Sequence, residues 1–363
     1  MQLLNVLQIK EPYHLFSEPS HYYDAMIDDI ESATRYIYLE TFRIGNDKIG
    51  ERFLQAFNKK AKEGLDVKLL IDGWGASNKG HELYGQIRKN GGAVRFFEKI
   101  KYNSDLFTKG HRRNHRKLLL IDDEISWIGS SNLTGYNMSW RESMLRMKSE
   151  ITYTFSRLFM QDFRLYNKYV FNKLHNTRLV RFEDFDIVRD VPSIAYKRIS
   201  KKFIRIFKSA KKRVVVETPY FLPGFLVRKA MMDAAKRGVE VTVLIPRHSD
   251  VTLVDILRNK YLGPLHKSGI RFLFYKTNNL HAKLMLADDE KFAIGSSNFD
   301  YRSFRYMLEI MIFGSDPAIC EQCKTHIEET LQQSEPFVYG SWKKRPLINK
   351  FFEWLLLPFR HLL

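Results

Sequence analysis

The sequence predicts an α/β protein that contains two copies of one structural unit, and two observations carry this prediction. One pattern occurs twice: His, one residue, Lys, four residues, Asp, six residues, then Gly-Ser-Ser-Asn. In both halves, segments rich in β-branched residues also alternate with segments of helical periodicity, as in mixed sheets covered by helices on both faces. The anchors of the two copies are His115, Lys117, Asp122, Gly129 and Asn132, and His281, Lys283, Asp288, Gly295 and Asn298.

The similarity between the halves extends well upstream of this pattern. Residues 36–41 resemble 214–218, and residues 61–67 resemble 235–241, so a whole unit was duplicated. The offset is 177 at Gly92 and Gly269 but 166 at the two histidines, so the first half carries about eleven extra residues between Glu98 and Asn114. This insertion is a candidate lip for an anionic substrate, because it holds Lys101, Lys109, His111, Arg112 and Arg113.

The expected elements follow the same order in each half. In the first half, apolar residues at helical spacing (Tyr22, Met26, Ile30) predict a helix at 20–33, and a second helix at 49–63 ends near Gly64. Period-two or continuous apolar segments predict the strands between and after them. We expect strands at 35–41, 66–71, 93–97, 117–121 and 125–128 in the first half. The second half predicts helices at 196–210 and 223–237 and strands at 213–218, 239–245, 270–274, 283–287 and 291–294.

Length and composition fit two packed lobes. The chain has 363 residues, 44% of them hydrophobic, which is enough for two substantial cores. Its apolar runs are shorter than the roughly 20 residues of a membrane span, and its first residues lack the pattern of a signal peptide, so we expect neither feature. The two cysteines, Cys320 and Cys323, have no second pair to complete a zinc site and are expected to be free thiols.

The charge is strongly positive and unevenly placed. There are 59 Lys and Arg against 41 Asp and Glu, a net charge of +18, which favours a polyanionic partner such as nucleic acid or an acidic lipid surface. The helix expected at 20–33 is acidic, whereas its counterpart at 196–210 carries many lysines and arginines. One side of the molecule is therefore expected to be much more positive than the other.

The repeated pattern has the chemistry of a phosphoryl site. Each His lies at the entrance of an apolar strand with Lys two residues later, so both side chains point to one face and can contact one anion. The Gly-Ser-Ser-Asn turn after the next strand can present hydroxyl, amide and backbone N–H groups to phosphate oxygens. The candidates for this second role are Ser130, Asn132, Ser296 and Asn298.

With these residues in place, the chain resembles the phospholipase D superfamily, whose signature is His-x-Lys, four residues, Asp, six residues, and then Gly-Ser-x-x-Asn or a close relative, here Gly-Ser-Ser-Asn. Both copies match in full, and the flanking segments are similar to those of bacterial cardiolipin synthases. Those segments are Trp140-Arg141-Glu142, Glu217-Thr218-Pro219-Tyr220-Phe221 and Asp300-Tyr301-Arg302-Ser303-Phe304. The resemblance implies two phospholipase D-like repeats, each a mixed sheet flanked by helices, related by a pseudo-twofold axis with one shared active site.

The resemblance also implies a two-step displacement that needs no metal or other cofactor. One imidazole attacks phosphorus to form a phosphohistidine, and the other protonates the departing oxygen and then deprotonates the incoming nucleophile. We expect His115 as the nucleophile and His281 as the acid and base, with Lys117 and Lys283 neutralising the phosphate.

Carboxylates complete the implied site. Each motif has an acid at a similar distance downstream of its histidine, Glu142 and Glu309, and the resemblance implies that these acids orient the imidazoles. Asp122 and Asp288 belong to the signature and are grouped here with its catalytic residues, but we expect them to stabilise turns around the site rather than to contact phosphate.

We expect three regions: a first repeat at 1–190, a second repeat at 191–340 and a C-terminal tail at 341–363. The tail joins a basic cluster to a short apolar segment rich in Phe, Trp and Leu. Such a segment suits either a helix lying in an anionic membrane interface or a terminal helix docked on the core. The membrane alternative predicts a peripheral protein on the cytoplasmic side of the bacterial inner membrane.

Three functions follow from the resemblance. The favoured one is a phosphatidyltransferase that uses phosphatidylglycerol as donor and a phospholipid, such as a second phosphatidylglycerol, as acceptor, and so forms cardiolipin at an anionic membrane surface. A hydrolytic phospholipase D would differ only in admitting water to the second step. A nuclease or other phosphodiesterase would also use the positive charge, but nucleic acid is the weaker candidate because the apolar tail has no evident use on it. The oligomeric state is left open.

Overall fold

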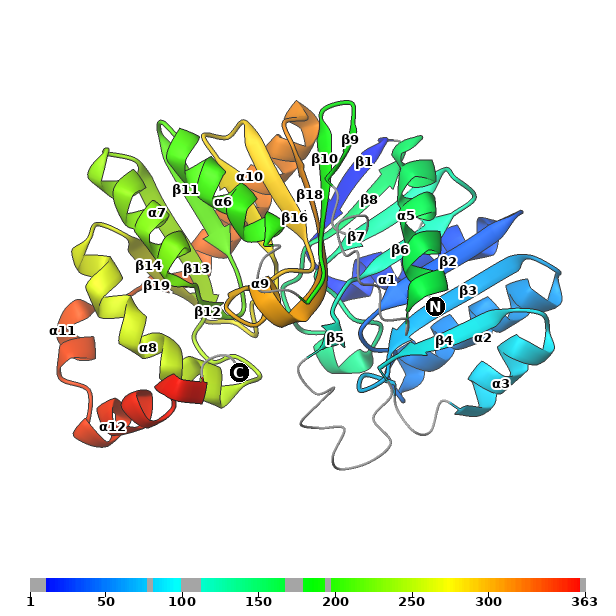
Figure 1. Ribbon diagram of the computed structural model, residues 1–363, viewed down its shortest axis with the longest axis horizontal. Helices are drawn as coiled ribbons and strands as arrows, with labels where there is room; N and C mark the ends of the chain where they lie inside the picture. Colours follow the sequence, from blue (N-terminus) through cyan, green and yellow to red (C-terminus); the bar gives the residue numbers. More distant parts are fainter. Residues whose placement is uncertain (1–10, 77–80, 99–111, 167–178, 193–196, 360–363) are drawn as a thin grey trace, which may run out of the picture.

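The computed structural model describes residues 11–76, 81–98, 112–166, 179–192 and 197–359, and it contains two large mixed sheets that stand side by side (Figure 1). The first sheet has the strand order β1-β8-β7-β6-β2-β3-β4. Among the described strand pairs of this sheet, β2–β3 and β3–β4 are parallel and the others are antiparallel. Its strands are β1 (Tyr13–Phe16), β2 (Tyr36–Thr41), β3 (Asp66–Asp72), β4 (Ala93–Phe97), β6 (Leu118–Ile121), β7 (Ile125–Gly129) and β8 (Met144–Lys148).

The second sheet repeats this order with additions at both edges. Its path is β9-β10-β18-β16-β15-β11-β13-β14-β19, so β10 takes the place of β1, and β9 and β19 are the additions. The strands are β9 (Val180–Phe182), β10 (Phe185–Asp190), β11 (Arg213–Glu217), β13 (Glu240–Pro246), β14 (Arg271–Tyr275), β15 (Leu284–Ala287), β16 (Lys291–Gly295), β18 (Met307–Gly314) and β19 (Ser334–Pro336). A separate pair joins β12 (Phe221–Leu222) to β17 (Phe299–Asp300) in parallel.

Helices cover both faces of each sheet, as alternation along the strands predicts. Ile37 and Leu39 of β2 face α1 (Pro19–Ser32), α2 (Lys48–Lys62) and α3 (His81–Lys89), whereas Tyr36 and Tyr38 face α5 (Ile151–Leu165). In the second repeat, α6 (Arg198–Ser209), α7 (Phe225–Lys236) and α8 (Thr252–Lys267) cover one face and α10 (Pro317–Gln332) covers the other. Cys320 and Cys323 are free and lie on the buried face of α10.

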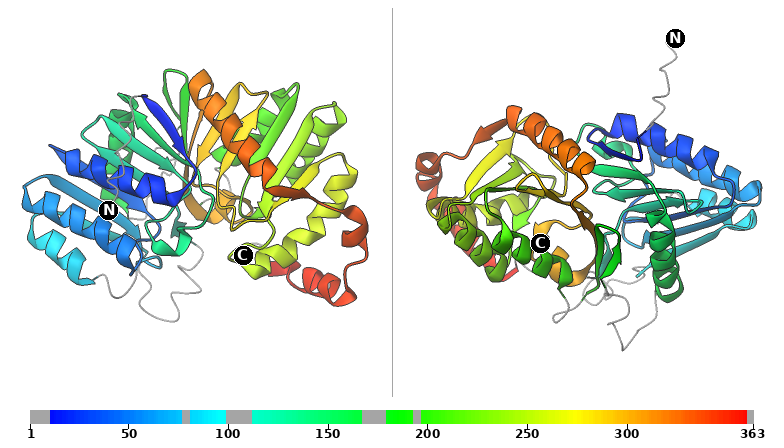
Figure 2. Two further views of the ribbon diagram at one scale, coloured as in Figure 1. Left: turned by 180° about the vertical axis from the view of Figure 1, so that it is seen from behind. Right: turned by 90° about the horizontal axis from the view of Figure 1, so that it is seen from above.

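The inner faces of the two sheets share one hydrophobic core. A single cluster of buried side chains contains Leu118 and Phe155 of the first repeat together with Leu284 and Ile319 of the second. The view from above shows α10 lying next to β1 across the junction, and the side chain of Gln322 in α10 accepts a hydrogen bond from the backbone N–H of Leu15, 2.7 Å away (Figure 2). The lobes are therefore joined along their inner faces.

The second sheet extends upstream of the expected boundary between residues 190 and 191. Residues 185–190 form β10, which pairs with β18, and β9 pairs with β10. We therefore propose that the second repeat begins before Val180.

The C-terminal tail docks on the second repeat. The helix α11 (Tyr339–Lys343) begins two residues before the expected tail, which continues with α12 (Leu347–Leu355) and the short helix η4 (Leu357–Phe359). The helix α12 lies against α8 at the lower left of Figure 1. Trp342 donates a 2.8 Å hydrogen bond to the carbonyl of Asn259, and Arg345 forms a bidentate ion pair with the buried Glu353. Across the described ranges, each helix is too short or too polar to cross a bilayer.

Candidate active site

Short backbone pairings across the lobe junction bring the two histidines together. Residues Arg113–Asn114 form β5, which pairs with the start of β18 from the other repeat, and the N–H of His115 donates to the carbonyl of Leu308, 3.0 Å away. The symmetric contact bridges Arg141 and Leu280, and the N–H of His281 donates to the carbonyl of Arg141 at 2.7 Å. Each motif is thus held by the other repeat.

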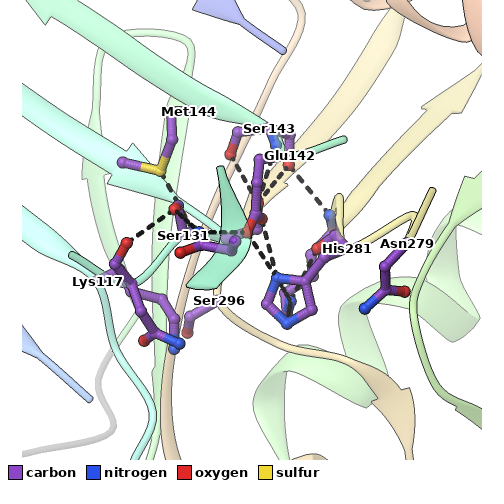
Figure 3. Close-up of polar contacts among 12 residues, drawn as sticks. Lys117, Ser131, Glu142, Ser143, Met144, Asn279, His281 and Ser296 are labelled. Atoms are coloured by element: carbon purple, nitrogen blue, oxygen red, sulfur yellow. Dashed lines mark hydrogen bonds and ion pairs between the residues drawn. The ribbon is translucent and has the colours of Figure 1, made fainter. Parts of the chain in front are cut away.

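The histidine–glutamate pairs cross between the repeats. Nδ1 of His115 lies 3.0 Å from Glu309, and Nδ1 of His281 lies 3.0 and 2.9 Å from the two oxygens of Glu142. Figure 3 shows the carboxylate of Glu142 facing the imidazole of His281. Each glutamate therefore contacts the histidine of the opposite repeat. The similar spacing of histidine and glutamate within each repeat did not reveal this exchange of partners.

The first serine of each Gly-Ser-Ser-Asn turn holds a glutamate. The hydroxyl of Ser130 donates to Glu142 at 2.5 Å, and the hydroxyl of Ser296 donates to Glu309. Asn137 adds a 3.1 Å hydrogen bond to Glu142. We predicted that Ser130 and Ser296 bind phosphate, but their hydroxyls face the carboxylates because the turns lie directly beside β8 and β18.

The asparagines of the two turns remain available to a ligand. The side-chain oxygens of Asn132 and Asn298 are buried and have no hydrogen-bond partner among the described residues. Asn298 also lines the open cavity beside His115. Buried polar atoms are normally paired, so these two unpaired acceptor oxygens suit an absent ligand or water that donates a hydrogen bond.

Two buried lysines supply the positive charge. Lys117 donates to the carbonyl of His115 at 2.7 Å, and Lys283 lies 3.0 Å from Nε2 of His281. Burial lowers the pKa of Lys117 to about 7, with the charge of Lys283 adding to the effect, and burial lowers the pKa of Lys283 to about 8. Two cations this close and this deeply buried favour an anion between them.

The two glutamates differ in their ionisation. Burial raises the pKa of Glu309 to about 8, so this acid is protonated at neutral pH. Burial also acts on Glu142, but His281, Lys283 and the hydrogen bond from Ser130 outweigh it and hold its pKa below the ordinary value. Burial lowers the pKa of both histidines, and for His115 the charges of Lys117 and Lys283 lower it much further.

Asp122 and Asp288 lie away from the reacting groups, at the far ends of β6 and β15 from the histidines. Asp122 accepts hydrogen bonds from the backbone N–H groups of Thr34, Arg35 and Tyr36, and Asp288 accepts from those of Lys211, Lys212 and Arg213. Both aspartates have positive φ, 55° and 54°. Both aspartates stabilise the turn that begins the neighbouring strand. Their position therefore does not fit a place among the catalytic residues of the signature.

A cavity of about 270 Å³ opens beside His115. Its polar lining includes Arg113, which is buried and paired with Asp72 at 3.1 Å, and Arg302. The apolar lining comprises Phe42, Trp74, Tyr220, Val251, Val254 and Met307. Phosphate-sized polar ligands attached to apolar chains suit such a cavity.

Sequence reasoning found only part of this lining. The loop after β3 supplies Trp74, whereas Arg247 of the loop after β13 lines a different cavity, under Trp342. Arg302 lies in the segment Asp300-Tyr301-Arg302-Ser303-Phe304, and its position in the sequence did not indicate that it lines the site. Within the insertion, Arg113 reaches the cavity, whereas Lys101, Lys109 and His111 fall outside the described residues.

Comparison with known proteins agrees with this geometry. The family described as "Cardiolipin synthase, PLD-like domain" matches residues 26–165 and 203–331. The cardiolipin synthase of Listeria welshimeri is 30% identical over 354 residues, covering 93% of this chain and 73% of the relative. Cardiolipin synthase 1 of Staphylococcus epidermidis is 31% identical over 359 residues, covering 94% and 72%.

Solved structures confirm the fold class. The phosphatidylserine synthase of Haemophilus influenzae superposes with a TM-score of 0.76 at 13% identity, covering 97% of this chain and 95% of that one. The polyphosphate kinase of Porphyromonas gingivalis superposes with a TM-score of 0.64 at 14% identity, covering 96% and 53%. At these identities the likeness concerns the fold alone and confirms the predicted α/β architecture, while the two segments matched by the family model confirm two phospholipase D-like repeats.

Proposed function

The chain belongs to the cardiolipin synthase family of phospholipase D-like proteins, and we propose that it transfers a phosphatidyl group from one phosphatidylglycerol to a second through a phosphohistidine on His115. The observation that carries this proposal is the meeting of two crossed histidine–glutamate pairs around two buried lysines. One imidazole can act on phosphorus while the other acts on the oxygen that leaves or enters.

The surroundings of His115 suit a nucleophile. The carbonyl oxygen of Ser296 lies 3.1 Å from Nδ1 and can only accept, so Nδ1 carries the proton and the lone pair of Nε2 is free. The low pKa keeps this imidazole neutral. Nε2 attacks phosphorus, and the bond from phosphorus to the glycerol oxygen of the headgroup breaks.

The surroundings of His281 suit an acid. The ionised Glu142 contacts Nδ1 with both oxygens and stabilises the imidazolium form. An anion that attracts Lys283 away from Nε2 removes the repulsion that lowers the pKa of this imidazole. His281 then protonates the departing glycerol oxygen in the first step.

The second step reverses these roles. His281, now neutral, takes the proton from a glycerol hydroxyl of the second phosphatidylglycerol, and that oxygen attacks the phosphatidyl-histidine. The phosphorus–nitrogen bond breaks, and the products over the cycle are cardiolipin and glycerol. Lys117, Lys283, Asn132 and Asn298 would hold the non-bridging oxygens throughout.

Exposed apolar side chains support a membrane surface as the partner. The docked helix α12 presents its outer face to solvent, with Leu347 79%, Phe351 52% and Trp354 66% exposed. Trp74, 55% exposed, lies at the cavity beside His115. The tail therefore combines the two expected alternatives, because one face docks on the core and the other can contact an anionic bilayer. We propose that the protein is peripheral and lies on the cytoplasmic side of the bacterial inner membrane.

Mass spectrometry of the products formed on phosphatidylglycerol vesicles tests the reaction. Cardiolipin and glycerol in equal amounts are expected from the wild type, and neither is expected from His115→Ala or His281→Ala. Phosphatidic acid as the main product would make the protein a hydrolase. Cleavage of single-stranded DNA in a parallel reaction, with the lipid left intact, would overturn the lipid assignment.

A further inference from the structure

A second cavity lies in the second repeat, beside the catalytic one and separate from it. Its volume is about 310 Å³, at the lower end of the roughly 300–1,000 Å³ typical of small-molecule sites. Its inner wall is apolar and is formed by Ile204 of α6, Leu222 of β12, Val227 of α7 and Phe304. None of the histidines, lysines or glutamates assigned to the reaction lines it.

The rim of this cavity is basic. Lys197 and Lys201 come from the start of α6, and Arg305 faces them from the segment after β17. Within the described ranges, no carboxylate forms an ion pair with any of the three. Burial lowers the pKa of Lys197, and the charges of Arg305 and Lys201 lower it further, so these cations are close enough to repel one another. An anion at the rim would relieve that repulsion.

The cavity also opens next to exposed apolar side chains. Phe225 and Leu226, in the first turn of α7, line it and are 65% and 66% exposed. Large apolar side chains exposed beside an apolar cavity indicate a surface that contacts a membrane or another apolar partner.

Residues in and next to the paired strands β12 and β17 line both cavities. Tyr220 lines the catalytic cavity, and Leu222, two residues later, lines the second one. After β17, Arg302 lines the catalytic cavity, whereas Tyr301 lines the second. The segment around β12 and the segment around β17 therefore each contribute one of these residues to the catalytic cavity and one to the second cavity.

We propose that the second cavity binds an anionic phospholipid, with an acyl chain against Ile204, Leu222 and Phe304 and the phosphate at Lys197, Lys201 and Arg305. The occupant follows from the combination of an apolar interior, a basic rim that has no carboxylate partner among the described residues, and exposed apolar side chains at the opening, which together match an amphiphile with one negative end. The site would hold a membrane lipid next to the catalytic cavity. It deepens the proposed function and rests on it only in the choice of phosphatidylglycerol as the lipid.

Photo-crosslinking tests this site without requiring turnover. The full chain is mixed with phosphatidylcholine vesicles that contain phosphatidylglycerol bearing a diazirine on one acyl chain, irradiated, and mapped by peptide mass spectrometry. Crosslinks are expected within residues 201–204, 222–228 and 301–305. Excess unlabelled phosphatidylglycerol should remove them, whereas excess glycerol phosphate should leave them, because the acyl chain contributes to binding.

Two variants act on the cavity by different means. Ile204→Trp fills the apolar wall without changing charge, and Lys197→Glu with Lys201→Glu reverses the rim. Each is expected to reduce crosslinking at these segments by roughly tenfold or more. The matched control is Arg205→Glu with Lys208→Glu, which makes the same charge change at exposed positions of α6 outside the cavity and should leave the crosslinks in place. Thermal unfolding verifies that every variant is folded.

The outcomes separate this proposal from the proposed reaction. Crosslinks at the second cavity in a protein that makes no cardiolipin would keep the site and reject the reaction. Crosslinks found only at the catalytic cavity would overturn the proposed lipid site. Crosslinks at the second cavity that persist in the two cavity variants would also overturn it, and so would the loss of these crosslinks when glycerol phosphate is added. Crosslinks between two protein chains would assign the cavity to a second copy and overturn the lipid proposal.

Discussion

The half-site of His115 and the half-site of His281 are built from the same parts and differ in charge. Each has an imidazole bound to a buried glutamate from the opposite repeat, a lysine two residues later and a serine on the glutamate. Yet the pKa of Glu309 is raised to about 8 and that of Glu142 is lowered. The comparison teaches that the signature supplies the groups, while their neighbours decide which group is charged.

The difference between the glutamates has identifiable causes. Glu142 contacts His281 with both oxygens and receives an additional hydrogen bond from Asn137. Glu309 reaches His115 with one oxygen, and the charge of the buried Asp300 raises its pKa further beyond the effect of burial. The first half-site is therefore suited to a neutral imidazole and the second to an imidazolium.

The largest expected effect comes from removing either histidine, and an activated substrate makes the two losses different. With phosphatidylglycerol, His115→Ala and His281→Ala should each lower kcat by about 10⁵-fold or more. A phosphatidyl ester of nitrophenol has a leaving group that needs no proton, so His281→Ala should still release one equivalent of nitrophenol per site in a rapid burst. His115→Ala should give no burst. The measurement is stopped-flow absorbance, and a burst in His115→Ala alone would exchange the two roles.

The glutamates should respond unequally to amide substitution. Glu142→Gln removes a charge that stabilises the imidazolium of His281 and should lower kcat by about 10³-fold. Glu309→Gln replaces an acid that is already protonated below pH 8, so at pH 6 to 7 the loss should stay within about tenfold. Steady-state rates of both variants across this pH range provide the test. Equal losses would mean that Glu309 works as an anion and that the half-sites are electrostatically alike.

The lysines should make anion binding weaken as the pH rises. A lysine is a cation below its pKa, so the free site holds two cations below pH 7, loses that of Lys117 near 7 and loses that of Lys283 near 8. The affinity for tungstate, which remains a dianion in this range, should fall by about tenfold for each lost charge. Inhibition constants measured from pH 6 to 9 report this, and Lys117→Met should remove the lower of the two steps while leaving the upper one. An affinity independent of pH would place both lysine pKa values outside the range.

Local patterns were sufficient for most of the fold. The expected helix at 20–33 and strand at 66–71 lie within one or two residues of α1 and β3, because amphipathic spacing and the glycine after α2 are local signals. The helix α5 and strand β8, which follow the first motif, were not predicted. For α5 the local signal was present, because its buried residues Ile151, Phe155 and Phe159 recur at helical spacing.

The site was predictable as a set of residues but not as a set of contacts. The spacing of the motifs identified His115, Lys117, His281 and Lys283. The crossing of Glu142 to His281 depends on the bridge between Arg141 and Leu280 across the junction, and the spacing of residues within one repeat does not indicate that contact. The same holds for Ser130, whose hydroxyl direction is set by the neighbouring strand β8.

The smallest effect on catalysis should come from Asp122 and Asp288, which the signature places beside the histidines and the structure places at turns. Asp122 also accepts a hydrogen bond from the hydroxyl of Thr34, one more than its counterpart accepts, and it is the more buried of the two. Asp122→Asn should therefore lower the free energy of unfolding by about 1–3 kcal/mol, and Asp288→Asn by less, while the turnover of folded protein stays within about twofold. Hydrogen bonds from backbone N–H groups outweigh burial and lower the pKa of both aspartates in the folded protein. Their contribution to the free energy of unfolding is therefore fully present above the ordinary pKa of Asp, near 4, and is lost as the pH falls through the pKa of the folded state. Denaturant unfolding at pH 7 and pH 3 measures the difference, with burst amplitude counting active sites. A loss of turnover in fully folded Asp122→Asn would return this residue to the catalytic set, because a turn that only begins a strand has no means of slowing the chemical step.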